Sequence, residues 1–545
     1  MTASEPAIAR QGMDWAPWWT MAAFAVAALP ILLVSVPPIL DYPNHLTRIW
    51  LLAGGAATAP LSAIYGADWS QASTNIGVDL VAMTLAHILP FTAIDKLLQL
   101  AMFLGPPLGC TLLNRAVFGR FHPWQIAFPI LAWSTTAIAG FLNFQISLGA
   151  ALIAAVLSRP EAGRPPWYDG ARYSASAFLL LLIHPFGLFF YAVLMAGLLV
   201  GPHWVWPVPP QRRREIIRGI AILALACAVP LLLLFLFAPV PPGMNASIEK
   251  EAAWHLATVL SPGRILKLLA SPVLTYDAPY DLLLTAPLAL VLVWARATGS
   301  LRMHAGLLLA ATGLLLLAII APASIGDATW IQRRIPPMLA LTLMAAVRPD
   351  VQRRAINRVM ALVLVLTLGA RVAWIGKIWH DRQIDSAQMF AAARVIPPGA
   401  SVIVLRQDLP DAVRAPLGRL MAGGPGRAIE TQRNMPSLAV IRYRVFIPIL
   451  FTVPGQQPLR VLGKWKVRST YVSSIPVPAD LNAPQPTDAY LRHWRQDFAY
   501  ILLINADLAT PHPLVTTGLR QIADTHFAKV YHILPSPGAY GALAP

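Results

Sequence analysis

The chain has 545 residues, of which 57% are hydrophobic and only 12% are charged. Soluble domains carry about 25% charged residues, so this composition, with a mean hydropathy of +0.58, excludes an ordinary soluble protein and indicates a polytopic membrane protein. The net charge of +17 is spread over short loops and the tail without a basic-aromatic module, which favours cytoplasmic loops near anionic lipid over nucleic-acid binding. Both cysteines, Cys110 and Cys227, lie in apolar runs, so no disulfide framework or cysteine metal site is expected.

The first predicted span is the apolar run Trp18 to Leu40, and it exceeds the about 20 residues that cross a bilayer. Directly after it, residues 41–48 read Asp-Tyr-Pro-Asn-His-Leu-Thr-Arg. A carboxylate at the lip of a membrane helix is well placed for chemistry at the interface, which makes Asp41 our candidate general base or hydroxyl-orienting group. The alternative is an acid that only caps or marks the end of the span.

Residues 41–96 form the first predicted outer loop. The apolar run Val78 to Leu89 within it is short and is ended by Pro90, so we expect a juxtamembrane helix near the interface and not a full span.

Ten further apolar runs follow the loop, and several are too short for a vertical, independent span. Together with the first span they predict about eleven spans. They are 97–114, 124–142, 145–158, 174–183, 186–202, 217–239, 281–295, 304–322, 335–347 and 356–376.

Arginines gather in five connections between these runs, and the positive-inside rule places all five in the cytoplasm. This arrangement needs outward turns at Asn143 and at His184-Pro185. It also places Asp41 and the loops 240–280 and 323–334 on the outer side. The connections hold Arg115 and Arg120; Arg159, Arg164 and Arg172; Arg212, Arg213, Arg214 and Arg218; Arg296 and Arg302; and Arg348, Arg353, Arg354 and Arg358.

The predicted outer loops bring further polar groups to the side of Asp41. Residues 249–255 have the pattern of a short amphipathic surface helix. Asp327, Arg333 and Arg334 come just before a span, and a guanidinium matches phosphate oxygens. The alternative for the two arginines is contact with lipid headgroups.

Three more residues are substrate-binding candidates. Asn44 and His45 follow Asp41 by three and four residues, so a helix stacks them near the carboxylate. His184 interrupts an apolar stretch before Pro185 and is expected to face the same side. The alternative for each histidine is an interfacial or buried residue without a ligand.

After residue 376 the charge rises and the apolar residues fall into short groups. We therefore divide the chain into a transmembrane domain over 1–376 and a soluble α/β domain over 377–545, outside the cytoplasm. Strands are predicted at Val402–Leu405, Ala439–Phe446 and Tyr500–Ile504, and a helix at 385–395. The fold class is a mainly α, polytopic transmembrane bundle with this C-terminal α/β domain.

This pattern resembles the C-type superfamily of integral membrane glycosyltransferases. The matching features are the first span followed by Asp41 in an outer loop, a juxtamembrane helix, many short spans and an outer C-terminal domain. The Asp-Tyr-Pro-Asn-His-Leu string is similar to one in uncharacterised bacterial membrane proteins of this type. Many relatives have two adjacent acids in the first loop, whereas here Tyr42 follows Asp41. This leaves a divalent metal open, and no other cofactor is implied.

The resemblance implies a hexosyl or pentosyl transferase of the bacterial inner membrane that acts on the outer face. Its donor is a polyprenyl-phosphate-linked sugar, and its acceptor is a lipid, a glycan or a protein. Asp41 then activates the acceptor hydroxyl, and Arg333 or Arg334 holds the phosphate as it leaves. The N-terminus is expected in the cytoplasm and the C-terminal domain in the periplasm.

Two other classes of function remain open from the sequence. The same charges can line the path of a lipid or small-molecule transporter or flippase. A non-catalytic membrane protein of envelope assembly is the other alternative.

Overall fold

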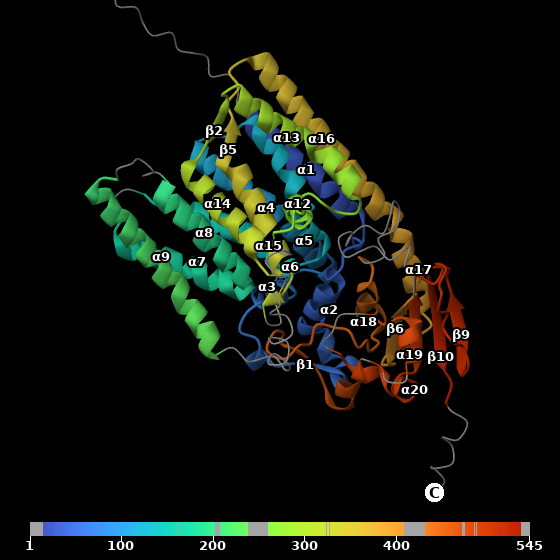
Figure 1. The fold of residues 1–545 in the computed structure, drawn as a ribbon. Coiled ribbons are helices and arrows are strands. Elements are labelled where there is room, and N and C mark those ends of the chain that lie inside the picture. Colours follow the sequence, from blue (N-terminus) through green and yellow to red (C-terminus); the bar gives the residue numbers. More distant parts are fainter. Residues whose placement is uncertain are drawn as a thin grey trace, which may run out of the picture.

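A computed structural model gives the structure of the chain (Figure 1). It describes residues 15–161, 163–201, 208–237, 260–322, 324–325, 328–407, 431–470, 475–483, 486 and 488–535. The predicted amphipathic helix at 249–255 lies outside the described residues.

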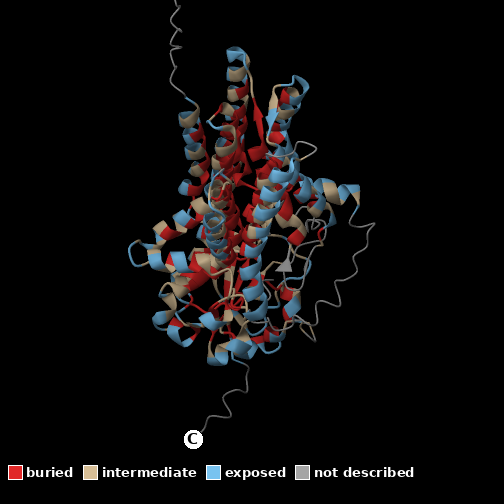
Figure 2. Cartoon of the chain, turned by 90° about the vertical axis from the view of Figure 1, so that its left-hand side faces the viewer, coloured by how far each residue is buried: buried red, intermediate tan, exposed pale blue. Residues whose placement is uncertain are grey.

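The chain is a polytopic helical membrane protein, as predicted. In the described part, five helical stretches are long and apolar enough to cross a membrane, and shorter apolar helices pack between them. Buried residues follow the centre of the bundle (Figure 2). Large apolar side chains such as Phe235 and Leu225 are exposed on its outside. The long helices of the bundle are α1 (Ala16–Leu33), α4 (Phe91–Phe118), α6 (Leu142–Leu157), α7 (Pro166–Ile183), α8 (Pro185–Val200), α9 (Pro210–Phe237), α13 (Ala278–Ala297), α14 (Ala305–Ile320), α15 (Ile331–Ala346) and α16 (Arg354–Asp381).

Small residues allow some of these helices to approach closely. A Cβ atom on Gly197 of α8 would lie 2.4 Å from the carbonyl oxygen of Gly306 in α14. Such small-residue contacts are typical of membrane helices, whose association depends on packing.

The predicted span at 124–142 is wrong. This stretch contains the 3-10 segment η4 (Pro123–Ala132) and one turn of helix, α5 (Thr135–Ile138), and residues 124–140 are buried. Pro129 removes a backbone donor from the middle of η4, which disfavours a continuous α-helix. Irregular backbone is tolerated at membrane depth only where protein surrounds it, and η4 packs against α1, α4 and α16.

The two ends of the bundle differ in chemistry. At one end, the short strands β2 (Leu301–Met303) and β5 (Val347–Pro349) pair, and Asp350 forms ion pairs with Arg120, Arg302 and Arg348. The first loop and the C-terminal part cover the other end (Figure 1). The basic connections that contain Arg120, Arg302 and Arg348 therefore lie at the end of the bundle opposite Asp41, as the sequence predicts.

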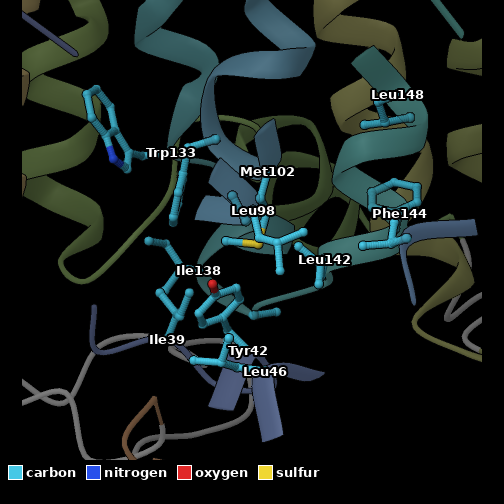
Figure 3. Packing of buried hydrophobic residues seen from close by; sticks show 14 of the residues in the cluster. Ile39, Tyr42, Leu46, Leu98, Met102, Trp133, Ile138, Leu142, Phe144 and Leu148 are labelled. Carbon is cyan, nitrogen blue, oxygen red and sulfur yellow. The ribbon is translucent and has the colours of Figure 1, made fainter. Parts of the chain in front are cut away.

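The first loop folds into helices α2 (Tyr42–Leu52) and α3 (Gly77–Leu85) and strand β1 (Tyr65–Ala67). At nine residues, α3 is too short to cross a bilayer. Tyr42 of α2 packs among Ile39, Leu98, Met102 and Ile138, so α2 is fixed to the base of the bundle (Figure 3).

The C-terminal part contains a four-stranded sheet in the order β6-β8-β10-β9. The strands are β6 (Val402–Arg406), β8 (Tyr500–Ile504), β9 (Leu519–Asp524) and β10 (Ala528–Ile533); β6 and β8 are parallel and the other pairs are antiparallel. Helix α17 (Gln383–Ala393) packs against β9 and β10. A further strand, β7 (Leu459–Val461), pairs with β1, so the C-terminal part and the first loop share a sheet.

Two of the three predicted strands are confirmed, β6 and β8, and the strand predicted at 439–446 is wrong. That segment forms helix α18 (Leu438–Tyr443), which buries Leu438, Ala439 and Val440 and packs against α2. Its β-branched content favours a strand, but strand propensity depends on neighbours, and here the neighbour is a helix.

The connection from α1 to Asp41 is held from several sides. The ammonium of Lys96 donates to the carbonyl oxygens of Ile31 and Ser35 at 3.0 and 3.1 Å, where the C-terminus of α1 leaves carbonyls unpaired. The side chain of Gln383 accepts from the backbone N–H and the hydroxyl of Ser35 at 3.0 and 2.7 Å. Residues 34–41 therefore reach the base of the bundle along a fixed path.

Candidate active site

Asp41 is the residue before the first turn of α2, and its backbone is fixed by a neighbouring segment. Its N–H donates to the carbonyl of Ala139 at 3.0 Å, and its carbonyl accepts from the N–H of His45 at 3.1 Å. Gly140 follows at φ +75°, and a Cβ there would lie 2.7 Å from the nitrogen of Asp41 and 2.5 Å from that of Tyr42. Both the left-handed backbone and the close approach therefore require glycine at position 140.

The carboxylate of Asp41 is half-buried and lies among cationic and amide groups. Its Oδ1 accepts from the Nδ2 of Asn434 at 3.0 Å, and the guanidinium groups of Arg433 and Arg334 interact with it electrostatically. Burial raises the pKa of Asp41 to about 6, although both guanidinium groups and the Asn434 amide act in the opposite direction. At pH 7 the group is therefore mostly ionised but more basic than an ordinary aspartate, as a general base needs to be.

Arg334 reaches the same place from the first turn of α15. Its guanidinium carbon lies 4.6, 5.2 and 5.4 Å from the ring centroids of Phe141, Phe144 and Phe186, an arrangement that favours a partly desolvated cation. Asp41 is the carboxylate that interacts electrostatically with it. The site thus places a positive and a negative group side by side at the end of the bundle.

His184 lies between α7 and α8 and contacts Arg334. The backbone N–H of Phe186 donates to its Nδ1 at 3.1 Å, and Nη1 of Arg334 lies 3.1 Å from its Nε2. Burial and the Arg334 charge hold the pKa of His184 well below 6.5, so the ring is neutral at pH 7. A neutral imidazole accepts at one nitrogen only. The Phe186 amide and Arg334 therefore compete for one acceptor; in the tautomer that accepts from Phe186, Nε2 carries the hydrogen, and His184 and Arg334 present N–H donors to the same space.

His45 lies one helical turn beyond Asp41. Its ring packs edge-on against Phe451 with centroids 4.9 Å apart. Burial, together with the charges of Arg48 and Arg334, holds the pKa of His45 well below 6.5. Its Nδ1 is buried and has no hydrogen-bond partner in the part of the chain that the structure describes. His45 is therefore a neutral ring next to Asp41 with a ring nitrogen that no described residue occupies.

The other predicted site residues are placed differently. Asn44 is buried away from the carboxylate, where its Nδ2 donates to the carbonyl of Ile449 at 3.2 Å and its Oδ1 accepts from the hydroxyl of Ser437. Arg333 stacks over the ring of Trp330 at 4.5 Å, whereas Arg334 is the arginine coupled to Asp41. Asp327 lies outside the described residues.

Arg433 and Asn434 are not predicted as site residues, because they stand in a C-terminal stretch of the sequence without a recognisable motif. The aromatic rings around Arg334 are not predicted either. Phe141, Phe144 and Phe186 flank the two predicted outward turns, and this pattern was the available signal for an enclosed cation.

The first loop fixes the two turns that carry His184 and Asn143. The hydroxyl of Thr74 donates to the carbonyl of Leu181 at 2.6 Å, and Nδ2 of Asn143 donates to the carbonyl of Asn75 at 2.7 Å. Both turns therefore lie at the Asp41 end, in agreement with the predicted turns.

A buried ion pair joins α2 to α3 next to the site. Arg48 and Asp79 are both fully buried, and Nη2 of Arg48 lies 2.9 Å from Oδ1 of Asp79. Breaking such a pair leaves an uncompensated charge, so this contact stabilises the arrangement of the first loop.

Arg264 of helix α12 (Pro262–Ala270) supports the start of α15. Its guanidinium donates to the carbonyls of Ile319 and Ala321 at 2.9 and 2.8 Å and to the side chain of Gln332 at 2.8 Å. These contacts join the end of α14 to Gln332, which lies in α15 two positions before Arg334. We assign Arg264 a structural role on this ground.

Among the described residues, no group of three His, Cys, Asp or Glu side chains comes together as potential metal ligands. The side chains around Asp41 are arginines, an asparagine and neutral histidines, which suit an anion better than a divalent cation. No step of the mechanism below depends on a metal.

No family model matches the sequence, and no curated protein matches it. Among solved structures, the chain is similar to the crystal structure of ArnT from Cupriavidus metallidurans bound to undecaprenyl phosphate, with 12% identity and a TM-score of 0.49. The similarity covers 96% of this chain and 98% of that chain. Because both measures are low, the function is derived from the site itself.

Proposed function

We propose that this protein is a membrane glycosyltransferase that moves a sugar from a polyprenyl-phosphate-linked donor to an acceptor hydroxyl. The observation that carries the proposal is the pairing of a carboxylate of raised pKa, Asp41, with converging N–H donors from Arg334 and His184. Transfer of a sugar from a phosphate needs a base on the acceptor side and positive charge on the leaving-group side.

Arg334 and His184 form the donor side of the proposed site. Two N–H donors that face each other repel. A phosphate accepts from several N–H groups at once, so a phosphate between Arg334 and His184 satisfies both donors. The aromatic rings around Arg334 exclude water and strengthen its interaction with an anion. A lipid phosphate also matches a site at the end of an apolar helical bundle, because its chain remains in the membrane.

Asp41 forms the acceptor side. In the reaction, Asp41 takes the proton of the acceptor hydroxyl while the hydroxyl oxygen bonds to the anomeric carbon of the sugar. The bond between that carbon and the phosphate oxygen breaks, and the polyprenyl phosphate leaves with its charge stabilised by Arg334. His45, neutral and one turn from Asp41, is placed to contact the sugar or the acceptor.

The proposal includes a location, the bacterial inner membrane with the site on its outer face. The basic connections lie at the opposite end of the bundle, and basic loops remain in the cytoplasm. The N-terminus is then cytoplasmic, and the division into a membrane part over 1–376 and a periplasmic part over 377–545 remains a prediction.

The test is an Asp41→Asn substitution in the chromosomal copy of the gene, so that the cells make only the variant protein. Asn keeps the size of the side chain and removes the base, and a missing general base costs about 10²- to 10⁴-fold in rate. We expect the affected glycan or glycolipid to disappear from mass-spectrometric profiles, although the variant is expressed at the normal level.

The matched control is Asp68→Asn. Asp68 lies in the same loop but away from Asp41; it is half-buried, accepts from Ser70 and pairs with Arg460. We expect Asp68→Asn to leave the profile unchanged. An unchanged profile with Asp41→Asn would sink the transferase proposal, and substrate transport that survives the change would favour the transporter alternative.

A further inference from the structure

Asn434 carries a buried polar atom that has no hydrogen-bond partner among the described residues. The residue precedes the short 3-10 helix η7 (Met435–Ser437) in the C-terminal part and is fully buried. Its Nδ2 donates to Oδ1 of Asp41 at 3.0 Å, but its Oδ1 has no hydrogen-bond partner among the described residues. Leaving a buried acceptor unpaired costs about 1–3 kcal/mol, so this oxygen requires an explanation.

The orientation of the Asn434 amide is set by Asp41. An ionised carboxylate only accepts hydrogen bonds, so the NH₂ group must face it and the carbonyl oxygen must be turned aside. Both groups belong to one planar amide, and the carbonyl oxygen therefore lies beside the carboxylate. The Asp41 carboxylate, which takes the proton in the proposed reaction, and Asn434 Oδ1 thus form two neighbouring acceptors, and Asn434 Oδ1 has no hydrogen-bond donor in the described part of the chain.

We propose that Asn434 binds the acceptor together with Asp41, and that the acceptor is a polyhydroxylated molecule, a glycan or glycolipid. One hydroxyl donates to Asp41 and its neighbour donates to Asn434. This inference rests on the proposed function and names the acceptor class of that same site. The C-terminal part then supplies a substrate-binding residue.

The chemistry of the two oxygens separates the possible acceptors. A lone hydroxyl, as on a serine or threonine side chain, has one hydrogen and satisfies only one oxygen. An ionised phosphate acceptor has no hydrogen to donate and is repelled by the carboxylate. Two adjacent hydroxyls of a sugar ring satisfy both oxygens, and the second hydroxyl keeps its hydrogen bond while the first transfers its proton to Asp41.

The first test uses acceptor analogues with the full chain in lipid nanodiscs. The donors are undecaprenyl-phosphate hexoses and pentoses, and the acceptors are methyl glycosides and their monodeoxy counterparts, which lack one hydroxyl beside the reacting one. We expect the wild type to prefer the complete glycoside by about tenfold in kcat/KM, the effect of one buried hydrogen bond. Asn434→Ala should abolish this preference, mainly by raising the KM of the complete glycoside.

Ser437→Ala is the control for this test. Ser437 lies on the same segment and joins it to Asn44, away from the carboxylate. Its loss should leave the preference for the complete glycoside intact. If Asn434→Ala keeps the tenfold preference while Asp41→Asn is inactive, the role of Asn434 is wrong and the transferase proposal survives. If Asp41→Asn transfers sugar as fast as the wild type, both proposals are wrong.

A second measurement needs no substrate. The infrared band of protonated Asp41 is identified as the carboxyl band that Asp41→Asn removes, and its loss with rising pH is followed in the full chain. Because the Asn434 amide lowers the pKa of Asp41, Asn434→Ala should move this transition to higher pH, and Ser437→Ala should not. The same transition in Asn434→Ala and wild type would contradict the contact between the two side chains.

Discussion

Two of the arginine–aspartate arrangements in the described part of the chain differ in what surrounds the charges. Arg371 of α16 and Asp281 of α13 form an ion pair in which both side chains are fully buried. Arg371 also donates to the carbonyls of Trp133 and Val273 at 3.1 and 2.5 Å, and Asp281 accepts from the hydroxyl of Thr275 at 2.7 Å. Partners from the protein itself thus surround this pair.

Arg334 and Asp41 are instead half-buried, and the described residues provide them with fewer hydrogen-bond partners. Arg334 is surrounded by aromatic rings and faces an N–H donor of His184, while Asp41 receives one amide. The same two residue types are therefore structural where the protein provides their partners, and available to a ligand where it does not.

Replacement of Arg371 by methionine should have the largest effect on stability. It leaves Asp281 buried without its counter-ion, which costs about 3–5 kcal/mol in the free energy of unfolding. Thermal unfolding of the full chain in detergent measures the effect. Adding Asp281→Leu should restore much of the loss, because an apolar pair carries no uncompensated charge. An unchanged unfolding temperature in Arg371→Met would show that this pair is not structural.

Arg334→Ala should show the opposite behaviour. It removes the group that neutralises the leaving phosphate, and we expect kcat to fall by about 10²- to 10³-fold. The unfolding temperature should change little, because the loss of the Asp41 interaction and of the ring contacts is offset by removing the desolvation cost of a half-buried charge.

Arg333→Ala is the matched control for Arg334→Ala. Arg333 stacks on Trp330, while the Asp41 carboxylate interacts with Arg334 and Arg433, so we expect kcat to fall by about two- to fivefold at most in Arg333→Ala. Equal losses of kcat in the two variants would contradict the assignment of Arg334 over its neighbour.

Gly140→Ala tests the backbone that places Asp41. The left-handed backbone costs an alanine about 1–2 kcal/mol, and the new Cβ displaces the nitrogen atoms of Asp41 and Tyr42. Gly119 has a similar φ of +79° but no atoms within 4 Å of the added Cβ. Gly119→Ala should therefore show the stability loss alone, whereas Gly140→Ala should also lower kcat. Normal activity in Gly140→Ala would mean that the position of Asp41 is not critical.

The pH dependence should show the smallest effect. Activity requires ionised Asp41, so the rate should rise with pH through about 6. Arg433→Ala should move this rise to higher pH, because one of the charges that lowers the Asp41 pKa is lost. A rate that already reaches its plateau at pH 4, the range of an ordinary aspartate, would contradict this assignment.

The same shift has a consequence for stability. The pKa of Asp41 is about 6 in the folded protein and 3.8 is its ordinary value, so the folded state binds the proton more tightly. The ionised carboxylate therefore destabilises the fold at neutral pH, and this cost disappears as the pH falls from about 6 to 4. Asp41→Asn should unfold at a higher temperature than the wild type at pH 7.5, and this gain should vanish at pH 4.

The sequence by itself determined the membrane class, most of the helices, strands β6 and β8, and the candidates Asp41, His45, His184 and Arg334. Hydropathy, charge at helix ends and local residue types carry this information along the chain. Only the tertiary structure decided that 124–142 is irregular, that 438–443 is a helix, and that Asn434 and Arg433 join Asp41 from nearly 400 residues away. These features depend on the tertiary contacts that a segment makes. Such contacts come from residues distant in the sequence, so a local sequence pattern does not contain them.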